Sequence, residues 1–217
     1  MQSKGTSVLL LIVLLGTAAG GSAAQPGRDN AFTLYAGYRD GGSFTDVTTG
    51  SKLPIEASGI GAVSLDLALN PKAGTQLQIY VSRQNSQVDA RLATQPPPPV
   101  APLPAKFPMS VTYAHIGGTV FPNRKIGQGP YLVGGMGATL FEPDLQGLAN
   151  ELRPSISLGI GYQLPFGERV ALRFEARGYA TLVNSDSGVF CSGGCVVSIK
   201  GDTVTQGDVQ LGLSLRY

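Results

Sequence analysis

The chain has 217 residues, of which 30 are glycine, and 14% of its residues are charged. Its formal net charge of +2 at pH 7 gives no support for a nucleic acid or another strong polyanion as partner. After residue 24 no apolar run approaches the roughly 20 residues of a membrane-spanning helix. A place in a membrane would therefore require a closed β-barrel, whose strands satisfy every backbone group.

Residues 1–24 have the pattern of a secretory signal peptide. Lys4 supplies a positive charge, an apolar stretch follows over residues 8–19, and small residues precede Gln25. We therefore expect cleavage between Ala24 and Gln25, export through a Sec-type route, and a single domain over residues 25–217. A transmembrane anchor is the alternative, but the apolar stretch is shorter than a helical span requires.

Eight segments of the remaining chain alternate between apolar and polar residues, as β-strands do when one face is apolar and the other polar. Phe32, Tyr38, Tyr113 and Tyr162 fall on the apolar faces, where we expect them to join aromatic girdles. The two faces of the Gly-rich segment 131–141 are not distinct. In chain order, the predicted strands lie at residues 32–39, 63–68, 76–82, 109–114, 131–141, 155–164, 170–181 and 208–217.

The predicted connections alternate strictly between short and long. The short ones, at residues 70–74, 122–128 and 165–168, contain proline or glycine. The long ones lie at residues 40–56, 84–108, 142–153 and 184–202. In an up-and-down barrel all the long loops then leave from one end, as in outer-membrane barrels. The Pro-rich stretch 95–104 is expected to be a stiff spacer, with a ligand for a Pro-binding module as the alternative.

Charged residues lie on the polar faces of several predicted strands. Arg173, Glu175 and Arg177 are spaced two apart and therefore point to one side of their strand. In a membrane barrel we expect such residues to form ion pairs across a narrow lumen, whereas in a soluble sandwich or barrel they would lie on a solvated outer face. The full predicted lumen network is Arg173, Glu175, Arg177, Asp66, Asp208 and Arg216.

The last predicted strand has an apolar residue at every second position: Val209, Leu211, Leu213, Leu215 and Tyr217. This pattern resembles the C-terminal signal that the barrel assembly machinery reads in bacterial outer-membrane proteins, in which Phe is usual and Tyr is an accepted variant. A tyrosine suits a membrane interface because its ring can be buried while its hydroxyl stays in water.

Over Phe32 to Tyr217 the chain resembles small outer-membrane β-barrel proteins, namely the OmpA/OmpX-type barrel domain and the opacity-protein-like surface antigens. The resemblance implies a place in the bacterial outer membrane. It also implies contact with outer-membrane lipid and with the barrel assembly machinery, and no enzymatic activity.

Few residues offer chemistry of their own. Cys191 and Cys195 are close together in an exported chain and are predicted to form a disulfide. A metal site, the alternative, would need further ligands, and no histidine or third cysteine is near. His115 is expected at the end of a strand near a short turn, in a structural role. Barrel enzymes such as lipid A deacylases and omptin-type proteases use a histidine, but the sequence shows no matching serine or aspartate.

The sequence therefore predicts an all-β fold, an eight-stranded antiparallel up-and-down transmembrane β-barrel preceded by a cleavable signal peptide. A lumen this narrow is filled by its own side chains, so no open channel, cofactor or metal is expected. We expect a monomer that displays four long surface loops to an unknown extracellular ligand, in a structural, adhesive or recognition role. The alternatives are a small porin or OmpW-like channel, and a soluble periplasmic lipocalin-like binding barrel.

Overall fold

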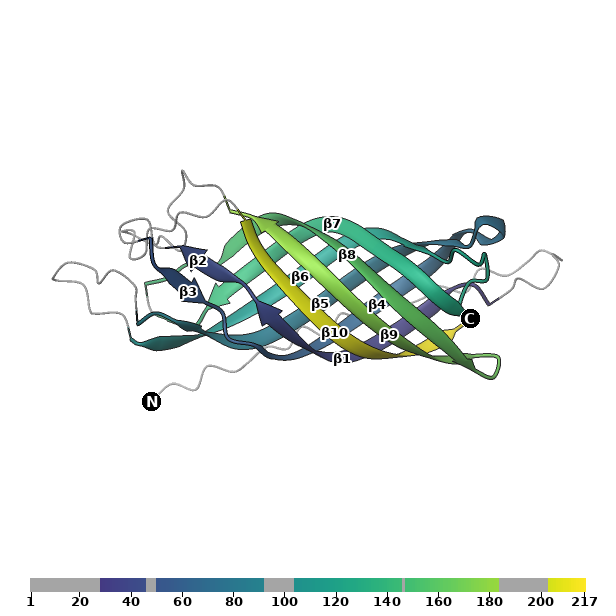
Figure 1. Ribbon diagram of the computed structural model, residues 1–217, viewed down its shortest axis with the longest axis horizontal. Helices are drawn as coiled ribbons and strands as arrows, with labels where there is room; N and C mark the ends of the chain where they lie inside the picture. The colour runs from purple at the N-terminus through teal and green to yellow at the C-terminus, as the bar shows by residue number, and fades with distance from the viewer. Residues whose placement is uncertain (1–27, 46–49, 92–103, 146, 184–202) are drawn as a thin grey trace, which may run out of the picture.

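The computed structural model describes residues 28–45, 50–91, 104–145, 147–183 and 203–217, and eight long antiparallel strands in them close into a barrel (Figure 1). The predicted eight-stranded fold is confirmed. The predicted signal peptide, with its cleavage site between Ala24 and Gln25, lies outside the described residues. The wall consists of β1 (Ala31–Gly41), β4 (Ser58–Asn70), β5 (Thr75–Asp89), β6 (Lys106–Val120), β7 (Gly129–Pro143), β8 (Glu151–Phe166), β9 (Val170–Leu182) and β10 (Thr203–Arg216).

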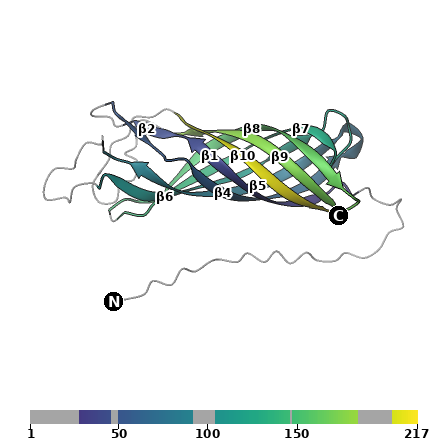
Figure 2. The same ribbon diagram turned by 60° about the horizontal axis from the view of Figure 1, so that its bottom comes forward.

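Each strand of the wall pairs with its neighbours in the chain, and β1 closes the ring by pairing with β10 as well as β4. Ala31 lies opposite Arg216 on one side and Asp66 on the other. Closure leaves no unpaired strand edge, which is the condition for a sheet in lipid. The strands run obliquely around the barrel, as Figure 2 shows. None of the helical segments in the described ranges is long and apolar enough to cross a membrane.

The two ends of the barrel differ, as predicted from the connection lengths. Residues 71–74, 121–128 and 167–169 form three short turns at one end, here called the turn end. The first contains η1 (Pro71–Ala73), in which Asn70 Oδ1 accepts a hydrogen bond from the Ala73 amide and Gly74 adopts a φ of 70°. The other connections leave from the opposite, loop end. The first of these contains a small hairpin of β2 (Ser43–Thr45) and β3 (Lys52–Pro54) (Figure 1).

The outer face of the wall is apolar and the inner face is largely polar. Leu158, Ile160 and Val209 are each more than 60% exposed on the outside, whereas Asp66 and Gln78 are buried inside. A soluble barrel would place its apolar residues in the interior, so this arrangement excludes the lipocalin-like alternative. The wall instead carries the lipid-facing band of a transmembrane β-barrel.

The polarity of the wall reverses toward the loop end, which corrects one prediction. Tyr113 was expected in an outer girdle, but it is completely buried in the lumen, while Phe32, Tyr38 and Tyr162 are exposed on the outside as expected. The reason is that β6 begins at Lys106, inside the predicted loop 84–108, and its first half extends beyond the apolar band. There, half-exposed Thr112 faces outward and the apolar residues face inward.

The inward-facing apolar residues near the loop end form a compact core, here called the mouth cluster. Its members include Phe44, Leu53, Ile55, Phe107, Met109 and Phe141. The β2–β3 hairpin contributes the first two of these, and the rings of Phe44 and Phe141 pack edge to face with centroids 5.4 Å apart. The hairpin therefore closes the barrel at its loop end with apolar side chains.

The Gly-rich segment, whose facing the sequence left open, forms the middle of β7. Tyr131, Val133 and Phe141 face the lumen, and Met136 faces outward. A Cβ atom on Gly137 would lie 2.0 Å from the Ala114 carbonyl oxygen, so a larger residue here would displace the β6 backbone. Glycine is thus needed where β6 and β7 approach each other.

The lipid-facing band leads to a stability prediction. Leu158→Arg places a charge in the middle of the outer band of β8 and should lower the free energy of unfolding in phospholipid vesicles by about 2–4 kcal/mol. Urea unfolding followed by far-UV circular dichroism measures the change. Gln87→Arg, on the outer face of β5 beyond the band, is the matched control and should change stability by less than about 0.5 kcal/mol. Equal effects of the two substitutions would contradict the position of the band.

Candidate functional site: the charged lumen

Six ionised side chains lie buried in the lumen, and their charges balance. They are three arginines and three carboxylates: Arg39, Arg173, Arg177, Asp66, Glu175 and Asp208. They point inward because each occupies a position in its strand that alternates with a lipid-facing neighbour. A buried charge without a partner is costly, so an equal number of opposite charges is what a closed, narrow lumen requires.

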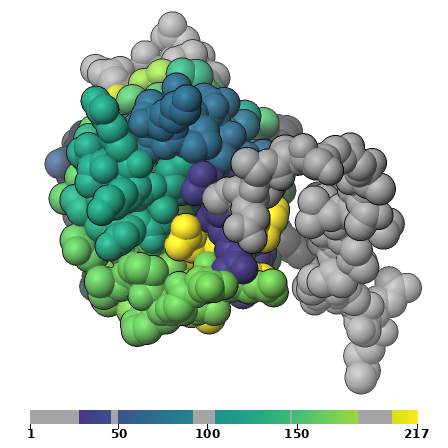
Figure 3. All heavy atoms as spheres, turned by 90° about the vertical axis from the view of Figure 1, so that its right-hand side faces the viewer, coloured from purple at the N-terminus to yellow at the C-terminus, as the bar shows by residue number. Residues whose placement is uncertain are grey.

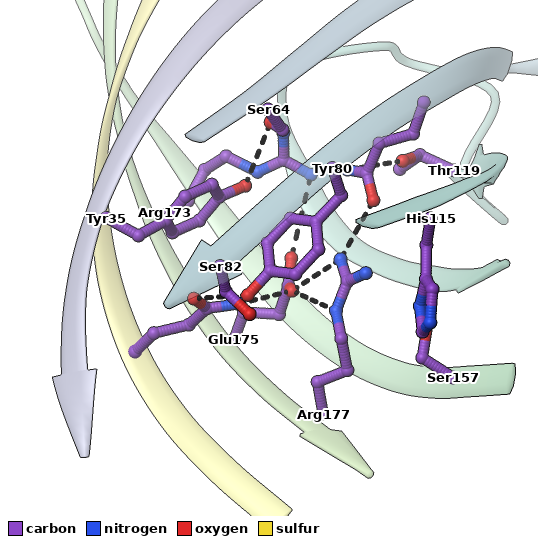
Figure 4. A network of polar contacts seen from close by, with 12 residues as sticks. Tyr35, Ser64, Tyr80, Ser82, His115, Thr119, Ser157, Arg173, Glu175 and Arg177 are labelled. Atoms are coloured by element: carbon purple, nitrogen blue, oxygen red, sulfur yellow. Dashed lines mark hydrogen bonds and ion pairs between the residues drawn. The ribbon is translucent and has the colours of Figure 1, made fainter. Parts of the chain in front are cut away.

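Ion pairs across the lumen connect β9 to β4. Arg173 Nη1 lies 2.8 Å from Asp66 Oδ2. Gln78 joins this pair to the next one, since its Nε2 donates to Asp66 Oδ1 (2.9 Å) and its Oε1 accepts from Arg177 Nη2 (2.8 Å). Figure 4 shows the side chains of Arg173 and Arg177 close to Glu175 in the same network. The network thereby ties together wall strands that are not neighbours.

Glu175 is the centre of the network. Its Oε1 lies 2.7 Å from Arg177 Nη2 and accepts a hydrogen bond from Gln210 Nε2 at 2.7 Å. Its Oε2 accepts from the Tyr131 hydroxyl at 2.9 Å. A single carboxylate therefore receives donors from β7, β9 and β10, which compensate its negative charge.

Aromatic rings surround the arginines. The Arg39 guanidinium lies beside the stacked rings of Tyr113 and Tyr179, 4.7 and 4.6 Å from their centroids. It also lies 2.7 Å from Asp208 Oδ2. Arg177 lies 3.9 Å from the Tyr80 ring centroid. Cation–π contacts of this kind stabilise a guanidinium most where water is excluded.

The predicted network is partly assembled in this way. Arg173, Glu175, Arg177 and Asp66 lie together, and Asp208 forms a second group with Arg39. Arg39 and the tyrosines were missed, although Arg39 has the same alternating phase as buried Thr33 and Tyr35.

Arg216 does not join the lumen network. It lies at the turn end, where its Nε donates to the Arg28 carbonyl at 3.1 Å. The reason is its position at the last residue of β10, below the lumen layer that Phe121 and Tyr131 occupy.

The remaining predicted residues divide into two groups. Val209, Leu211, Leu213, Leu215 and Tyr217 are all exposed on the outer face. Cys191 and Cys195, with their predicted disulfide, lie outside the described residues.

His115 lies within β6 rather than at its end, and its ring is buried in the lumen. Its Nδ1 is 2.8 Å from Ser157 Oγ and its Nε2 is 2.8 Å from Ser155 Oγ. No local sequence pattern points to these serines, because only the barrel register brings β8 within reach of His115. Figure 4 shows Ser157 beside the His115 ring. Both ring nitrogens are thus occupied by hydroxyl groups that link β6 to β8 across β7.

The lumen is closed at several levels. The mouth cluster fills the loop end, the ion-pair network fills the middle, and an apolar group of Phe121, Ile126, Tyr131 and Val133 fills the turn end. Within the described ranges, no three His, Cys, Asp or Glu side chains are arranged to hold a metal ion.

No protein-family model matches the chain, and no curated protein matches it. Among solved structures, the Neisserial surface protein A is 13% identical, with 86% of this chain and 99% of that one covered and a TM-score of 0.48. The outer membrane protein OprG from Pseudomonas aeruginosa is 13% identical, with 87% and 96% covered and a TM-score of 0.47. The outer membrane protein AlkL, solved in lipid bilayers, is 10% identical, with 94% and 97% covered and a TM-score of 0.48.

At this level of similarity the fold assignment depends on the strand pairing of the chain itself. A closed ring of eight antiparallel strands, an apolar outer band, a polar lumen, and short turns opposite long connections together define an outer-membrane-type β-barrel protein.

Loss of the central carboxylate should destabilise the barrel strongly. Glu175→Gln leaves the Arg177 guanidinium buried without its counter-charge, and we expect a loss of about 3–5 kcal/mol in the free energy of unfolding. A heat-modifiability gel and urea unfolding in vesicles measure it.

The matched control is Glu142→Gln, which removes the carboxylate of the partly exposed Arg83–Glu142 pair (2.5 Å) and should cost at most about 1 kcal/mol. A Glu175→Gln protein as stable as the parent would mean that the central charges have access to water.

Proposed function

We propose that the chain is a non-enzymatic protein of the bacterial outer membrane that displays its long connections at the cell surface, in a structural, adhesive or recognition role. The observation that carries this proposal is the filled lumen. Side chains occupy it at the loop end, in the middle and at the turn end, and the charges in the middle are paired with one another rather than left for a permeating ion.

A transport role has less support. A porin needs a water-filled passage, and eight strands enclose a space that side chains can fill completely. A lateral path for apolar molecules needs a gap in the wall. The hydrogen-bonded ladders from β8 through β9 and β10 to β1 run without a register shift over the paired residues.

The loop end has features of a recognition surface. Strands β5 and β6 extend beyond the apolar band, and the mouth cluster holds the β2–β3 hairpin against them. An open hollow of about 610 Å³ lies beside the hairpin, lined by Ser43, Lys52, Pro54, Asp89 and Arg91. A firmly supported rim with such a hollow favours binding at the cell surface over a purely structural wall.

The buried position of His115 supports a non-enzymatic role. Catalysis on a substrate requires access, and His115 and its serine partners are all less than 10% exposed. Among the hydrogen-bond partners of His115 in the described ranges there is no carboxylate to orient the ring, as a hydrolytic triad would need.

The filled lumen predicts that the purified protein forms no steady channel. In a planar bilayer, we expect no conductance steps of nanosiemens size across a wide range of voltages. Insertion is checked independently on the same sample, by the heat-dependent shift of the folded band on a gel. Regular steps from the inserted protein would overturn the assignment and favour a porin.

Surface display predicts an asymmetry between the two ends. Gly147 at the loop end and Gly167 at the turn end both have positive φ values and open space around them, so each should accept a short epitope without loss of folding. On intact cells we expect an antibody to detect the epitope after Gly147 and not the one after Gly167. After the outer membrane is permeabilised, both should be detected. The reverse pattern would contradict the proposed orientation.

A further inference from the structure

The charges outside the lumen are unevenly distributed between the two ends of the barrel. Among the side chains of the described residues, the turn end has six cations and two carboxylates, whereas the loop end has five cations and six carboxylates. The cations at the turn end are Arg28, Lys72, Arg124, Lys125, Arg169 and Arg216, and its carboxylates are Asp29 and Glu168. The overall charge of +2 conceals this difference.

The two groups of cations also differ in their partners. At the loop end, four of the five cations form ion pairs with carboxylates: Arg83 with Glu142, Arg91 with Asp89, Lys106 with Glu56, and Arg153 with Glu151. At the turn end, Arg28 pairs with Glu168, and this hydrogen bond lowers the pKa of the Glu168 carboxyl, which therefore remains charged.

Four cations at the turn end have no such partner. Lys72, Arg124, Lys125 and Arg169 are exposed and form no side-chain hydrogen bond or ion pair with any described residue. We call these four residues the basic ring. They lie on all three short turns, and Figure 3 shows the three turns gathered around this end of the barrel.

A contact between two of the turns brings three members of the basic ring to neighbouring positions. The Phe121 amide donates to the Gly74 carbonyl at 2.8 Å, so the turn carrying Lys72 packs against the turn carrying Arg124 and Lys125. Arg124 has a φ of 58°, a left-handed conformation that a non-glycine residue adopts only at a cost. A cation is thus kept at a position where glycine or asparagine would be easier to accommodate.

Each turn also presents a large apolar residue on the outer wall just before its cation. Leu69 precedes Lys72 and is 70% exposed, Val120 precedes Arg124 and is 42% exposed, and Phe166 precedes Arg169 and is 61% exposed. An apolar side chain in the bilayer edge, followed by a cation a few residues farther out, matches the order of acyl chain and phosphate in a phospholipid.

We propose that the basic ring binds the headgroups of anionic phospholipids in the leaflet at the turn end. The lipid phosphates supply the negative charge that the described protein residues do not, while Leu69, Val120 and Phe166 contact the first part of the acyl chains. An anionic wall polymer could also attract the cations, but it would leave these three apolar residues without a role. The inference depends on the chain being inserted in a bilayer.

The absence of tryptophan from the chain makes a direct test possible. Phe166→Trp provides a single fluorophore at the turn end, and Tyr38→Trp provides one on the outer wall toward the loop end. Each protein is folded into phosphatidylcholine vesicles that contain either brominated phosphatidylcholine or brominated phosphatidylglycerol. Bromine quenches tryptophan on contact, so the ratio of the two quenching curves gives the relative affinity for the anionic lipid.

At position 166 we expect phosphatidylglycerol to be preferred about fivefold, the effect of one neighbouring cation at an anionic surface. Replacing Lys72, Arg124, Lys125 and Arg169 by glutamine should reduce the preference to about one. Replacing Lys52, Arg83, Arg91 and Lys106 at the loop end is the matched control and should leave it unchanged. Arg124→Lys with Arg169→Lys should retain it, and high salt should weaken it.

Equal quenching by the two lipids at position 166, or a preference that survives loss of the basic ring, overturns the inference. It is also overturned if the parent protein sediments with isolated peptidoglycan and the ring variant does not, while the ring variant keeps its lipid preference. The cations would then bind the wall polymer. A heat-modifiability gel verifies insertion into pure phosphatidylcholine vesicles. Failure of the lipid preference in an inserted protein leaves the proposed function intact, whereas failure to insert contradicts both.

Discussion

Three arginine side chains lie in the lumen of a barrel whose outer face is apolar, and each needs negative charge within its reach. Asp66, Glu175 and Asp208 supply it, and tyrosine rings cover the faces of the guanidinium groups. The rest of the structure depends on this balance. Because the opposite charges lie close together in a buried lumen, the pairs are strong enough to tie distant strands together.

The order of layers along the barrel follows from the surroundings of the wall. Where lipid covers the outside, apolar residues face outward and the polar ones must find partners inside. Where β5 and β6 pass beyond the lipid, the pattern reverses, and the mouth cluster becomes an ordinary hydrophobic core beneath the β2–β3 hairpin. The same wall thus has its apolar side chains outside in the membrane part and inside at the loop end, where they support the β2–β3 hairpin.

Much of this arrangement could be predicted from the alternation of residues along the strands. The features that could not be predicted depend on where a residue lies along the barrel axis. The inward direction of Arg173, Glu175 and Arg177 follows from period two in the strand. The predicted outward direction of Tyr113 was wrong, because alternation separates the two faces of a strand but does not say whether lipid or water lies outside. The prediction that Arg216 belongs to the lumen network was wrong, because a residue can have the inward phase of its strand and still lie beyond the apolar group that fills the turn end. The serines beside His115 depend on the register of three strands, which no local pattern encodes.

The ion pair between Arg173 and Asp66 has a consequence for the size of the barrel. Two strands, β10 and β1, separate the strands that carry these residues, so the pair spans the interior rather than running along the wall. In a wider ring of ten strands these two positions would lie farther apart, and the short contact between Arg173 and Asp66 would have to lengthen. The ion pair therefore fits the diameter of an eight-stranded ring, so charge pairing in the lumen and the size of the barrel are linked.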